Sequence, residues 1–332
     1  MRPKYDFSYL VDKIMGAEFC EEPFKHIYLE KLFTPEHFDE ILASREISGP
    51  TAKNDLELIK GLRANGFKPI SFPGCVTDVD EYIKWHGGGK VGNHHSACEG
   101  FGMVLRLYEF HSPILEELNQ FLASREFNDA IAQKFGVDPE VCIIDGGIQK
   151  YLDGYEISPH PDIRKKAATF MVNINPSDKS EGMDHHTHYL KFDDAHKYVE
   201  SFWQGNKCVD RAWVPWDWAV TVKQQTKNNS IVLFSPSDDT LHGVKADYDH
   251  LVTQRTQLYG NLWYRENLTT SKSEWEDLDL SGRAAPSRKP ASPPLTNRMK
   301  QAVSSVMLPA IKRKLKSLMV RDAGHDVGKR NI

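Results

Sequence analysis

The strongest constraint on the fold is a series of short apolar runs between residues 141 and 264. Each run is about as long as a strand and rich in β-branched and aromatic residues, and Asn, Asp, Gly, Pro or Ser separates it from the next. The runs are VCIIDGGIQKYL, AATFMVNIN, VPWDWAVTV, SIVLFSP and TQLYGNLWY. No helical pattern alternates with them, which disfavours a doubly wound parallel sheet and predicts a sandwich, barrel or jelly roll.

The region before these runs has patterns of more than one kind of secondary structure. Thr34-Pro35-Glu36 has the signature of a helix start, with a hydroxyl cap, a proline in the first turn and an acidic residue near the positive end of the dipole. Residues 54–64 and 112–122 have apolar side chains at three- and four-residue spacing and also predict helices. We therefore expect residues 1–140 to form a mixed helical and strand region that buttresses a β-rich core at residues 141–267.

A glycine-rich stretch, HGGGKVG, lies at residues 86–92. It lacks the spacing of a phosphate-binding P-loop, and no clear helix follows it. We interpret it as a mobile surface loop, with a phosphate cradle as the alternative.

Residues 268–332 are predicted to form a Pro/Ser-rich linker and a basic amphipathic tail. From residue 281 onward the chain has 12 Lys and Arg against 2 Asp and Glu, which leaves 30 of the 42 basic and 44 of the 46 acidic residues in the body. An acidic body is a poor surface for nucleic acid. For the tail, three interpretations remain open: a peripheral membrane contact, a docking helix for a partner protein, and a solvated terminus.

The five cysteines are odd in number, widely spaced and without a C-x-x-C pair, so neither a disulfide framework nor a thiolate zinc site is expected. No apolar run approaches the roughly 18–20 residues that a membrane span needs. Asp6 and Asp12 accompany the only apolar stretch near the start of the chain, which argues against a signal peptide. These features together predict a cytoplasmic protein.

The segment His160-Pro161-Asp162 is a candidate metal site. Residues two apart on an extended strand point to the same side, so His160 and Asp162 can both reach one ion. His242, which follows the buried run SIVLFSP, is the candidate third ligand from a distant strand. Two histidines and one carboxylate are the ligand set of non-haem Fe(II) oxygenases.

The same H-x-D pattern occurs at His37-Phe38-Asp39. That segment lies in a predicted helix, where residues two apart point roughly 200° away from each other and cannot share a metal. We assign it to a solvated helix face.

Taken in order, the motifs between residues 141 and 265 resemble the Fe(II)/2-oxoglutarate-dependent dioxygenase superfamily, and within it the prolyl-hydroxylase-like branch. Tyr151-x-x-Gly154 precedes the H-x-D motif, and the strand AATFMVNIN follows it. FSPSDDTLHGV is similar to the segment that carries the distal iron ligand, and Arg255 follows His242 by thirteen residues. The resemblance implies a mainly β fold, with a double-stranded β-helix (jelly roll) core and flanking helices.

The resemblance also implies roles for these residues. His160, Asp162 and His242 would be the catalytic ligands of Fe(II), and O2 and 2-oxoglutarate the cosubstrates. Arg255 would bind the far carboxylate of 2-oxoglutarate through bidentate, charge-assisted hydrogen bonds, and Tyr151 could add a hydroxyl. Gln257 faces the same side as Arg255, and the nearest following tryptophan is farther from Arg255 than such enzymes often place it.

Three other sets of residues have weaker claims to the site. His186 and His188 would share a strand face beside His185, as an adventitious metal site or as part of the active-site rim. Arg164 could contact an anionic substrate or be a surface charge. Tryptophans that we interpret mainly as sheet packing, with a place at the mouth of the pocket as the alternative, are Trp213, Trp216 and Trp218.

The resemblance implies a dioxygenase that hydroxylates a C–H bond of an amino acid, free or peptidyl, or of a small biosynthetic metabolite. A sugar, a lipid precursor or a nucleic acid are alternative substrates, and the acidic body disfavours the last. Asp162 disfavours the halogenating relatives, which lack this carboxylate. An alternative of a different class is a non-catalytic jelly roll that binds a metal or another ligand.

Overall fold

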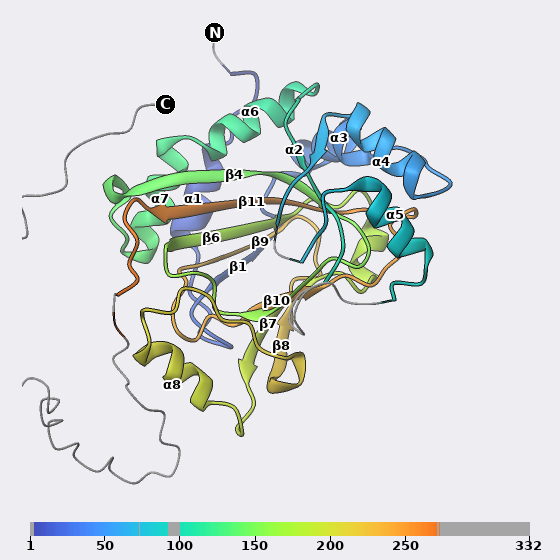
Figure 1. Cartoon of the computed structure of the whole chain (residues 1–332). Coiled ribbons are helices and arrows are strands. Elements are labelled where there is room, and N and C mark those ends of the chain that lie inside the picture. Colours follow the sequence, from blue (N-terminus) through green and yellow to red (C-terminus); the bar gives the residue numbers. More distant parts are fainter. Residues whose placement is uncertain (1–2, 73, 92–99, 271, 273–332) are drawn as a thin grey trace, which may run out of the picture. The chain divides into compact units, whose positions relative to one another are not determined.

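The computed structural model describes residues 3–72, 74–91, 100–270 and 272. Its strands form two sheets, and every pair of neighbouring strands is antiparallel (Figure 1). The larger sheet has the order β1-β9-β6-β11-β4-β3-β2, and the smaller one the order β5-β10-β7-β8. The predicted jelly-roll class, mainly β with flanking helices, is confirmed.

The strands of the larger sheet are β1 (Ile27–Glu30), β2 (Phe67–Pro69), β3 (Val104–Leu107), β4 (Cys142–Tyr151), β6 (Lys166–Asn173), β9 (Ser230–Phe234) and β11 (Arg255–Tyr264). Those of the smaller sheet are β5 (Glu156–His160), β7 (Thr187–Phe192), β8 (Ala219–Gln224) and β10 (His242–Lys245). The N-terminal region therefore supplies three strands of the larger sheet.

Eight helices flank the sheets in the part of the chain that the structure describes. They are α1 (Tyr9–Gly16), α2 (Pro35–Ala43), α3 (Arg45–Ser48), α4 (Asp55–Ala64), α5 (Val79–Gly87), α6 (Pro113–Leu122), α7 (Arg125–Phe135) and α8 (Tyr198–Gly205). Three short 3-10 helices accompany them: η1 (Pro139–Val141), η2 (Asp178–Gly182) and η3 (Trp216–Trp218).

The larger sheet has one apolar face and one polar face, and β11 shows the division most clearly. Leu258 and Leu262 point into the main hydrophobic core, with apolar side chains of α1, α2, α4, α6 and α7. The alternate side chains of β11 point the other way and line a cavity. They are Arg255, Gln257, Tyr259, Asn261 and Trp263. Because successive strand residues face opposite sides, burying one face against helices presents the other to the cavity.

The N-terminal helices follow the predicted signals. Thr34 caps α2 by accepting a hydrogen bond from the backbone N–H of His37 at 3.3 Å, and Pro35 occupies the first turn. Asn54 caps α4 in the same way, through the backbone N–H of Glu57 at 3.0 Å. The prediction for residues 112–122 corresponds to α6.

Two local expectations were wrong. The glycine-rich stretch is not a loop throughout, because α5 continues through Gly87, and Lys90 then forms ion pairs with Asp153 and Asp247. The run VPWDWAVTV is not one strand, since η3 occupies its centre and β8 begins only at Ala219. Pro215 immediately before η3 removes a backbone donor from any sheet ladder at that point.

Gly102 allows a neighbouring segment to approach the turn that precedes β5. A Cβ on Gly102 would lie 2.1 Å from the backbone nitrogen of Tyr155 and 2.3 Å from its Cα. Because backbone atoms cannot move aside cheaply, we expect Gly102→Ala to lower the free energy of unfolding by about 1–3 kcal/mol. Urea denaturation measures this, with Gly16→Ala as the control, since no heavy atom lies within 4 Å of a Cβ there. Equal stabilities of the two variants would contradict the close approach.

Contacts within the chain define one unit from Met1 to Leu278 and a second from Asp279 to Ile332. The basic tail that the sequence predicts lies outside the described residues, as does Cys98, one of the five cysteines. Among the described helices, none is long and apolar enough to cross a membrane.

Candidate metal centre

Two paired strands bring the predicted histidines together. His160 ends β5 and His242 begins β10, and the two are direct partners in the antiparallel ladder. Their ring centroids are 4.4 Å apart. The pairing places one histidine from each strand on the same side of the smaller sheet, facing the cavity.

Asp162 reaches the same point by a turn of the backbone. Its Oδ1 lies 3.6 Å from His160 Nε2, and its Oδ2 lies 3.8 Å from His242 Nε2. We expected His160 and Asp162 on one extended strand, but β5 ends at His160 and Asp162 has a left-handed φ of 69°. Aspartate tolerates this conformation better than most residues, because its short side chain can form local hydrogen bonds.

Backbone carbonyls fix the orientation of both imidazoles. His160 Nδ1 lies 2.8 Å from the carbonyl oxygen of Ser158, and His242 Nδ1 lies 3.0 Å from that of Thr240. Since a carbonyl only accepts, each Nδ1 carries the proton, and each Nε2 presents a lone pair toward Asp162. Metal-ligating histidines almost always have such a partner on the other ring nitrogen.

The charge states also suit a metal centre. Burial, reinforced by the neighbouring His160, lowers the pKa of His242 to about 3, which keeps its imidazole neutral. Burial alone would raise the pKa of Asp162, but Lys166, His242 and His160 outweigh it and hold that pKa well below its usual range. The site therefore offers a neutral imidazole at His242 and a carboxylate at Asp162.

Two residues that sequence reasoning missed hold Asp162. Lys166 Nζ lies 2.7 Å from Asp162 Oδ1, and the hydroxyl of Thr169 lies 3.3 Å from Oδ2. Thr169 is also 3.0 Å from Asn261 Oδ1 on β11. No motif marks Lys166 or Thr169, because their role depends on the turn at Asp162.

The ligand atoms of His160, Asp162 and His242 all lie within 4.8 Å of one another, and all three residues are buried. This set could hold a metal ion. Two histidines and a carboxylate fit Fe(II) with open positions, and they also occur at catalytic zinc sites. Other residues of the cavity must therefore show whether Fe(II) or zinc is the metal that fits.

Arg255 provides a buried cation in the same cavity. Its side chain is only 2 % exposed, and its Nη2 donates to Thr187 Oγ1 at 3.0 Å and to Gln257 Oε1 at 2.9 Å. Its Nη1 is buried and has no hydrogen-bond partner among the described residues. Burial lowers the pKa of this guanidinium, but an arginine stays charged. An unpaired donor on a buried charge is costly, which indicates that a ligand anion completes the site.

Tyr151 and Gln257 hold the guanidinium in place. The Arg255 guanidinium carbon lies 4.3 Å from the centre of the Tyr151 ring, and the Tyr151 hydroxyl donates to Gln149 Oε1 at 2.6 Å. Gln257 accepts from Arg255 through its oxygen and donates through its nitrogen to Asn173 at 2.8 Å. Both residues thus orient Arg255, and the Tyr151 hydroxyl, which the sequence suggested could add a hydrogen bond to the cosubstrate, donates to Gln149.

The register of β7 and β10 sets the separation between Arg255 and the metal site. Arg255 contacts Thr187, which pairs with Val244, whereas His242 pairs with Tyr189. Thr187 and His242 are therefore two residues apart along the paired strands, or about 6.6 Å. Through its contact with Thr187, Arg255 is therefore held close to the strand pair that carries His242.

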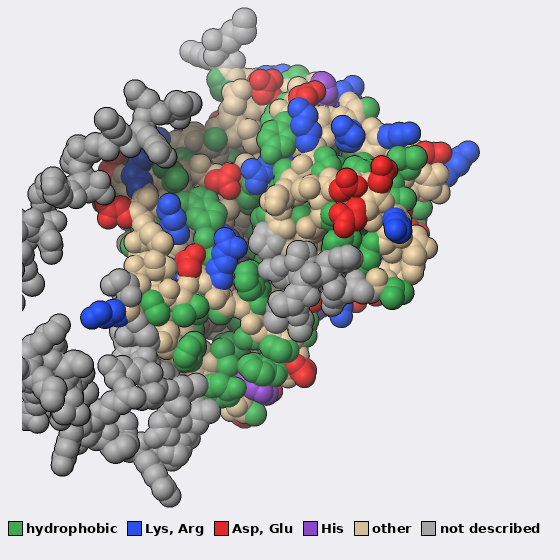
Figure 2. Space-filling model, in the orientation of Figure 1, with side chains coloured by type: hydrophobic (Ala, Val, Ile, Leu, Met, Phe, Trp, Pro, Cys, Tyr) green, Lys and Arg blue, Asp and Glu red, His purple; other side chains and the backbone are tan. Residues whose placement is uncertain are grey.

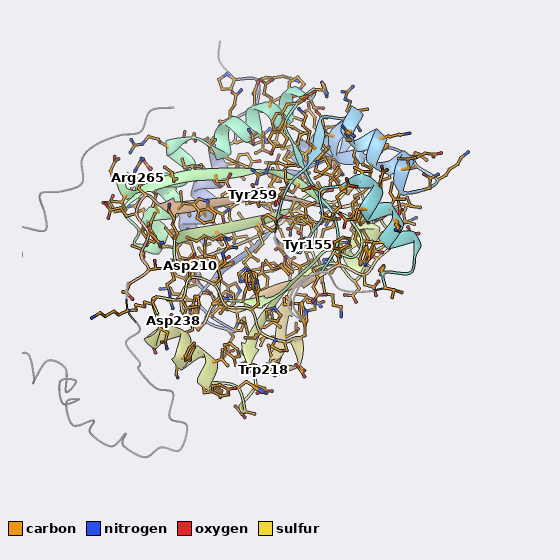
Figure 3. The ribbon with its side chains drawn as sticks, viewed as in Figure 1. Tyr155, Asp210, Trp218, Asp238, Tyr259 and Arg265 are labelled. Atoms are coloured by element: carbon orange, nitrogen blue, oxygen red, sulfur yellow. The ribbon has the colours of Figure 1, made fainter. Side chains whose placement is uncertain are left out.

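The cavity between the sheets has a volume of about 220 Å³ and contains all five residues predicted for the site. Those are His160, Asp162, His242, Arg255 and Tyr151. Tyr155 and Tyr259, labelled in Figure 3, belong to its aromatic lining. Asp210, in the same figure, precedes the exposed lining residue Arg211.

Apart from Trp213, the other residues considered for the site lie outside this cavity. Of the three tryptophans, only Trp213 lines the cavity. His188 contacts Thr221 and the ring of Trp216, and neither it nor its two histidine neighbours line the cavity. His37 and Asp39 belong to none of the candidate metal-binding groups among the described residues.

Arg164 has a structural role that sequence reasoning missed. It donates to the backbone carbonyls of Trp203 and Val209 and packs over the Trp203 ring, with its guanidinium carbon 4.0 Å from the ring centre. It does not line the cavity. Arg164 is therefore neither a simple surface charge nor placed to contact a substrate there.

A second group of ligand-type residues, Asp55, His86 and His250, does not suit a metal. His250 Nδ1 accepts from the backbone N–H of Asp153 at 3.0 Å, so its proton is on Nε2, 3.0 Å from Asp55 Oδ1. His86 has a carboxylate at each nitrogen, Asp55 at 2.6 Å and Asp153 at 2.8 Å. Neither imidazole presents a lone pair toward Asp55, so the group is a hydrogen-bond network that joins α4 and α5 to the turns beside β4 and β11.

This network predicts a pH-dependent contribution to stability. The hydrogen bond to Asp153 raises the pKa of His86, while the pKa of Asp153 is lowered to about 2. Because the pKa of His86 is higher in the folded state than in the unfolded state, its protonated form stabilises the fold fully below about pH 6.5. This stabilisation is lost as the pH rises through the pKa of His86 in the folded state. We expect His86→Gln to cost more stability at pH 5.5 than at pH 9, as measured by urea denaturation. A cost that is constant or grows with pH would contradict this charge state.

No protein-family model matches the chain, and no curated protein matches it. Solved structures similar to the chain are prolyl hydroxylases and 2OG-Fe(II) oxygenases, the class that the sequence motifs resemble. A prolyl-4-hydroxylase from Pseudomonas putida is 11% identical with a TM-score of 0.38, and the match covers 79% of this chain and 100% of that one.

A prolyl hydroxylase from Trichoplax adhaerens, solved with a peptide fragment of hypoxia inducible factor, is 10% identical with a TM-score of 0.39, over 78% of this chain and 89% of that one. A 2OG-Fe(II) oxygenase family protein from Burkholderia pseudomallei is 10% identical with a TM-score of 0.33, over 80% and 94%. At these values the function rests on the geometry of the site itself.

Proposed function

We propose that the chain is an Fe(II)- and 2-oxoglutarate-dependent dioxygenase that hydroxylates a C–H bond of an amino acid, free or peptidyl, or of a small biosynthetic metabolite. The observation that carries this proposal is the pairing of two features in one cavity. The first is a buried His-Asp-His set whose Nε2 lone pairs face the carboxylate. The second is a buried arginine that has an unpartnered Nη1 and is hydrogen-bonded to Thr187, a residue two positions from His242 along the paired strands β7 and β10.

Each residue has a defined task in this reaction. His160, Asp162 and His242 would hold the iron and leave its other positions open. Arg255 would bind the far carboxylate of 2-oxoglutarate through Nη1, while Thr187, Gln257 and Tyr151 fix its orientation. When bound, Fe(II) supplies the oxidative chemistry. In the overall reaction one oxygen atom of O2 enters the substrate as a hydroxyl, the other enters succinate, and CO2 leaves.

The buried arginine discriminates against a zinc hydrolase. A hydrolytic zinc site needs only the metal-bound water and a base near the substrate. It has no need of a buried cation with an unpartnered donor inside the same cavity. Fe(II) with 2-oxoglutarate uses both features.

The test is turnover of 2-oxoglutarate without a primary substrate. The full chain is purified anaerobically, loaded with Fe(II), and exposed to O2 and 2-oxoglutarate. We expect one Fe(II) per chain and succinate formation above a blank without iron. A non-catalytic jelly roll is the second candidate, since the same residues could bind a metal and an anion without turnover. Binding of both ligands with no succinate formed would favour it.

A further inference from the structure

The cavity has a second set of hydrogen-bond donors that neither the triad nor Arg255 uses. Arg106 comes from β3, where it pairs with Gln149 of β4. Its guanidinium carbon lies 5.0 Å from the centre of the Tyr259 ring on β11. Gly147, the partner of Tyr259 on β4, has no side chain, and a Cβ there would touch both Arg106 and Tyr259 at 3.7–3.9 Å. These are ordinary van der Waals distances, so Arg106, Tyr259 and Gly147 are close neighbours on this face of the sheet.

Three buried donors in the cavity lack partners among the described residues. They are Arg106 Nε, the hydroxyl of Tyr259 and the indole nitrogen of Trp213. Buried polar atoms are nearly always hydrogen-bonded, so three unsatisfied donors lining one cavity indicate that a ligand supplies the acceptors. Tyr259 is four residues from Arg255 along β11, or about 13 Å between their Cα atoms, so these donors are separate from the cosubstrate anchor.

The donors line the same cavity as the carboxylate of the metal centre and are connected to it through β11. Asn261 is two residues beyond Tyr259 on the same face of β11, and its Oδ1 is 3.0 Å from Thr169 Oγ1. That hydroxyl in turn lies 3.3 Å from Asp162 Oδ2. A ligand held by Arg106 and Tyr259 is therefore placed beside the metal centre, where a primary substrate must lie.

Asp145 determines which charges a ligand bound beside Arg106 can carry. It lines the cavity opposite Asn261 in the β4–β11 ladder, and its Oδ1 is 3.6 Å from Arg106 Nη1. A cation and an anion side by side are complementary to a zwitterion, with its carboxylate at Arg106 and its ammonium group at Asp145. A phosphate dianion would be repelled by Asp145, and an uncharged peptide backbone would offer neither Arg106 nor Asp145 an opposite charge beyond the one that each already has in the other.

We propose that Arg106, Tyr259 and Trp213 bind the free carboxylate, and Asp145 the ammonium group, of an α-amino acid that is the primary substrate. This inference rests on the proposed function and narrows its substrate class from free or peptidyl amino acids to free ones.

The test uses the full chain loaded with Fe(II) and 2-oxoglutarate. Succinate release is measured with an equimolar mixture of the proteinogenic amino acids, with the corresponding carboxamides, with capped tripeptides, and with a mixture of sugar phosphates. We expect stimulation by the free amino acids alone. Stimulation by carboxamides or capped tripeptides to the same extent, by phosphates alone, or by none of the mixtures would overturn the proposal.

Variants then test the individual residues with the amino acid that stimulates best. Arg106→Gln and Tyr259→Phe should raise its dissociation constant, measured by anaerobic calorimetry, by about tenfold or more, because each removes a buried hydrogen-bond donor. Asp145→Asn should weaken binding of the amino acid but not of its N-acetyl derivative. The control is Arg125→Gln, an exposed residue paired with Glu140 outside the cavity, which should change nothing. Unchanged affinity in Arg106→Gln and Tyr259→Phe would refute the subsite.

Failure of this inference is distinguishable from failure of the proposed function. Uncoupled turnover of 2-oxoglutarate and its dependence on Fe(II) are measured in every variant before any amino acid is added. If the unaltered chain shows neither uncoupled turnover of 2-oxoglutarate nor a dependence on Fe(II), both proposals are wrong. If both are present and the free amino acids are not preferred, only the substrate assignment is wrong.

Discussion

Replacing His160 or His242 by alanine should abolish 2-oxoglutarate turnover while leaving the protein folded. Each substitution removes one of the two Nε2 lone pairs that face Asp162, and a carboxylate with a single imidazole cannot hold iron in the required geometry. Because loss of an outer partner of a metal ligand already costs 10–100-fold, loss of a ligand should reduce turnover by at least about a hundredfold. Succinate formation, bound iron and circular dichroism are measured on the same samples.

His37→Ala is the matched control for this experiment. His37 belongs to the same H-x-D pattern in sequence, but it lies in α2, where its Nδ1 is 3.0 Å from the Tyr9 hydroxyl. Its replacement should leave turnover and bound iron unchanged. An inactive His37→Ala variant together with an active His160→Ala variant would place the metal centre elsewhere.

The triad was predictable because its signals are local. His160 and Asp162 are two residues apart, and His242 follows a run, SIVLFSP, that became the buried strand β9. What the sequence could not show is how Asp162 reaches the site. Its left-handed backbone follows from the end of β5 and the contacts with Lys166 and Thr169, which exist only in the fold.

The partners of Arg255 illustrate a second limit. Arg255 was predictable from its distance to His242, but Thr187 lies on β7, in a histidine-rich stretch that we interpreted only as a possible metal site or rim. The six residues of β7 contain no apolar run comparable to those of the predicted strands. Arg106 was missed for a similar reason, since β3 is only four residues long and its register against β4 is a long-range property.

Replacing Arg255 by alanine should remove the preference for a dicarboxylate cosubstrate. In the unaltered chain, Nη1 is buried without a partner, and a carboxylate there would gain a charge-assisted hydrogen bond. Truncating one member of such a buried pair costs about 2–5 kcal/mol, so the dissociation constant of 2-oxoglutarate should rise by roughly thirtyfold or more. Bound iron should be nearly unchanged, because Arg255 contacts Thr187 and Gln257 and not the triad.

A comparison of two cosubstrates separates the loss of this carboxylate contact from general damage to the cavity. 2-Oxopentanoate has the same carbon chain as 2-oxoglutarate but lacks the far carboxylate. The unaltered chain should bind 2-oxoglutarate much more tightly than 2-oxopentanoate, whereas Arg255→Ala should bind the two about equally. Arg255→Lys should retain part of the preference, since an ammonium group keeps the charge but cannot form the same paired donors. Both affinities are measured anaerobically on the iron-loaded protein. If Arg255→Ala still preferred 2-oxoglutarate as strongly as the unaltered chain does, another cation of the cavity would have to be the anchor, and Arg106 would then be the first residue to test.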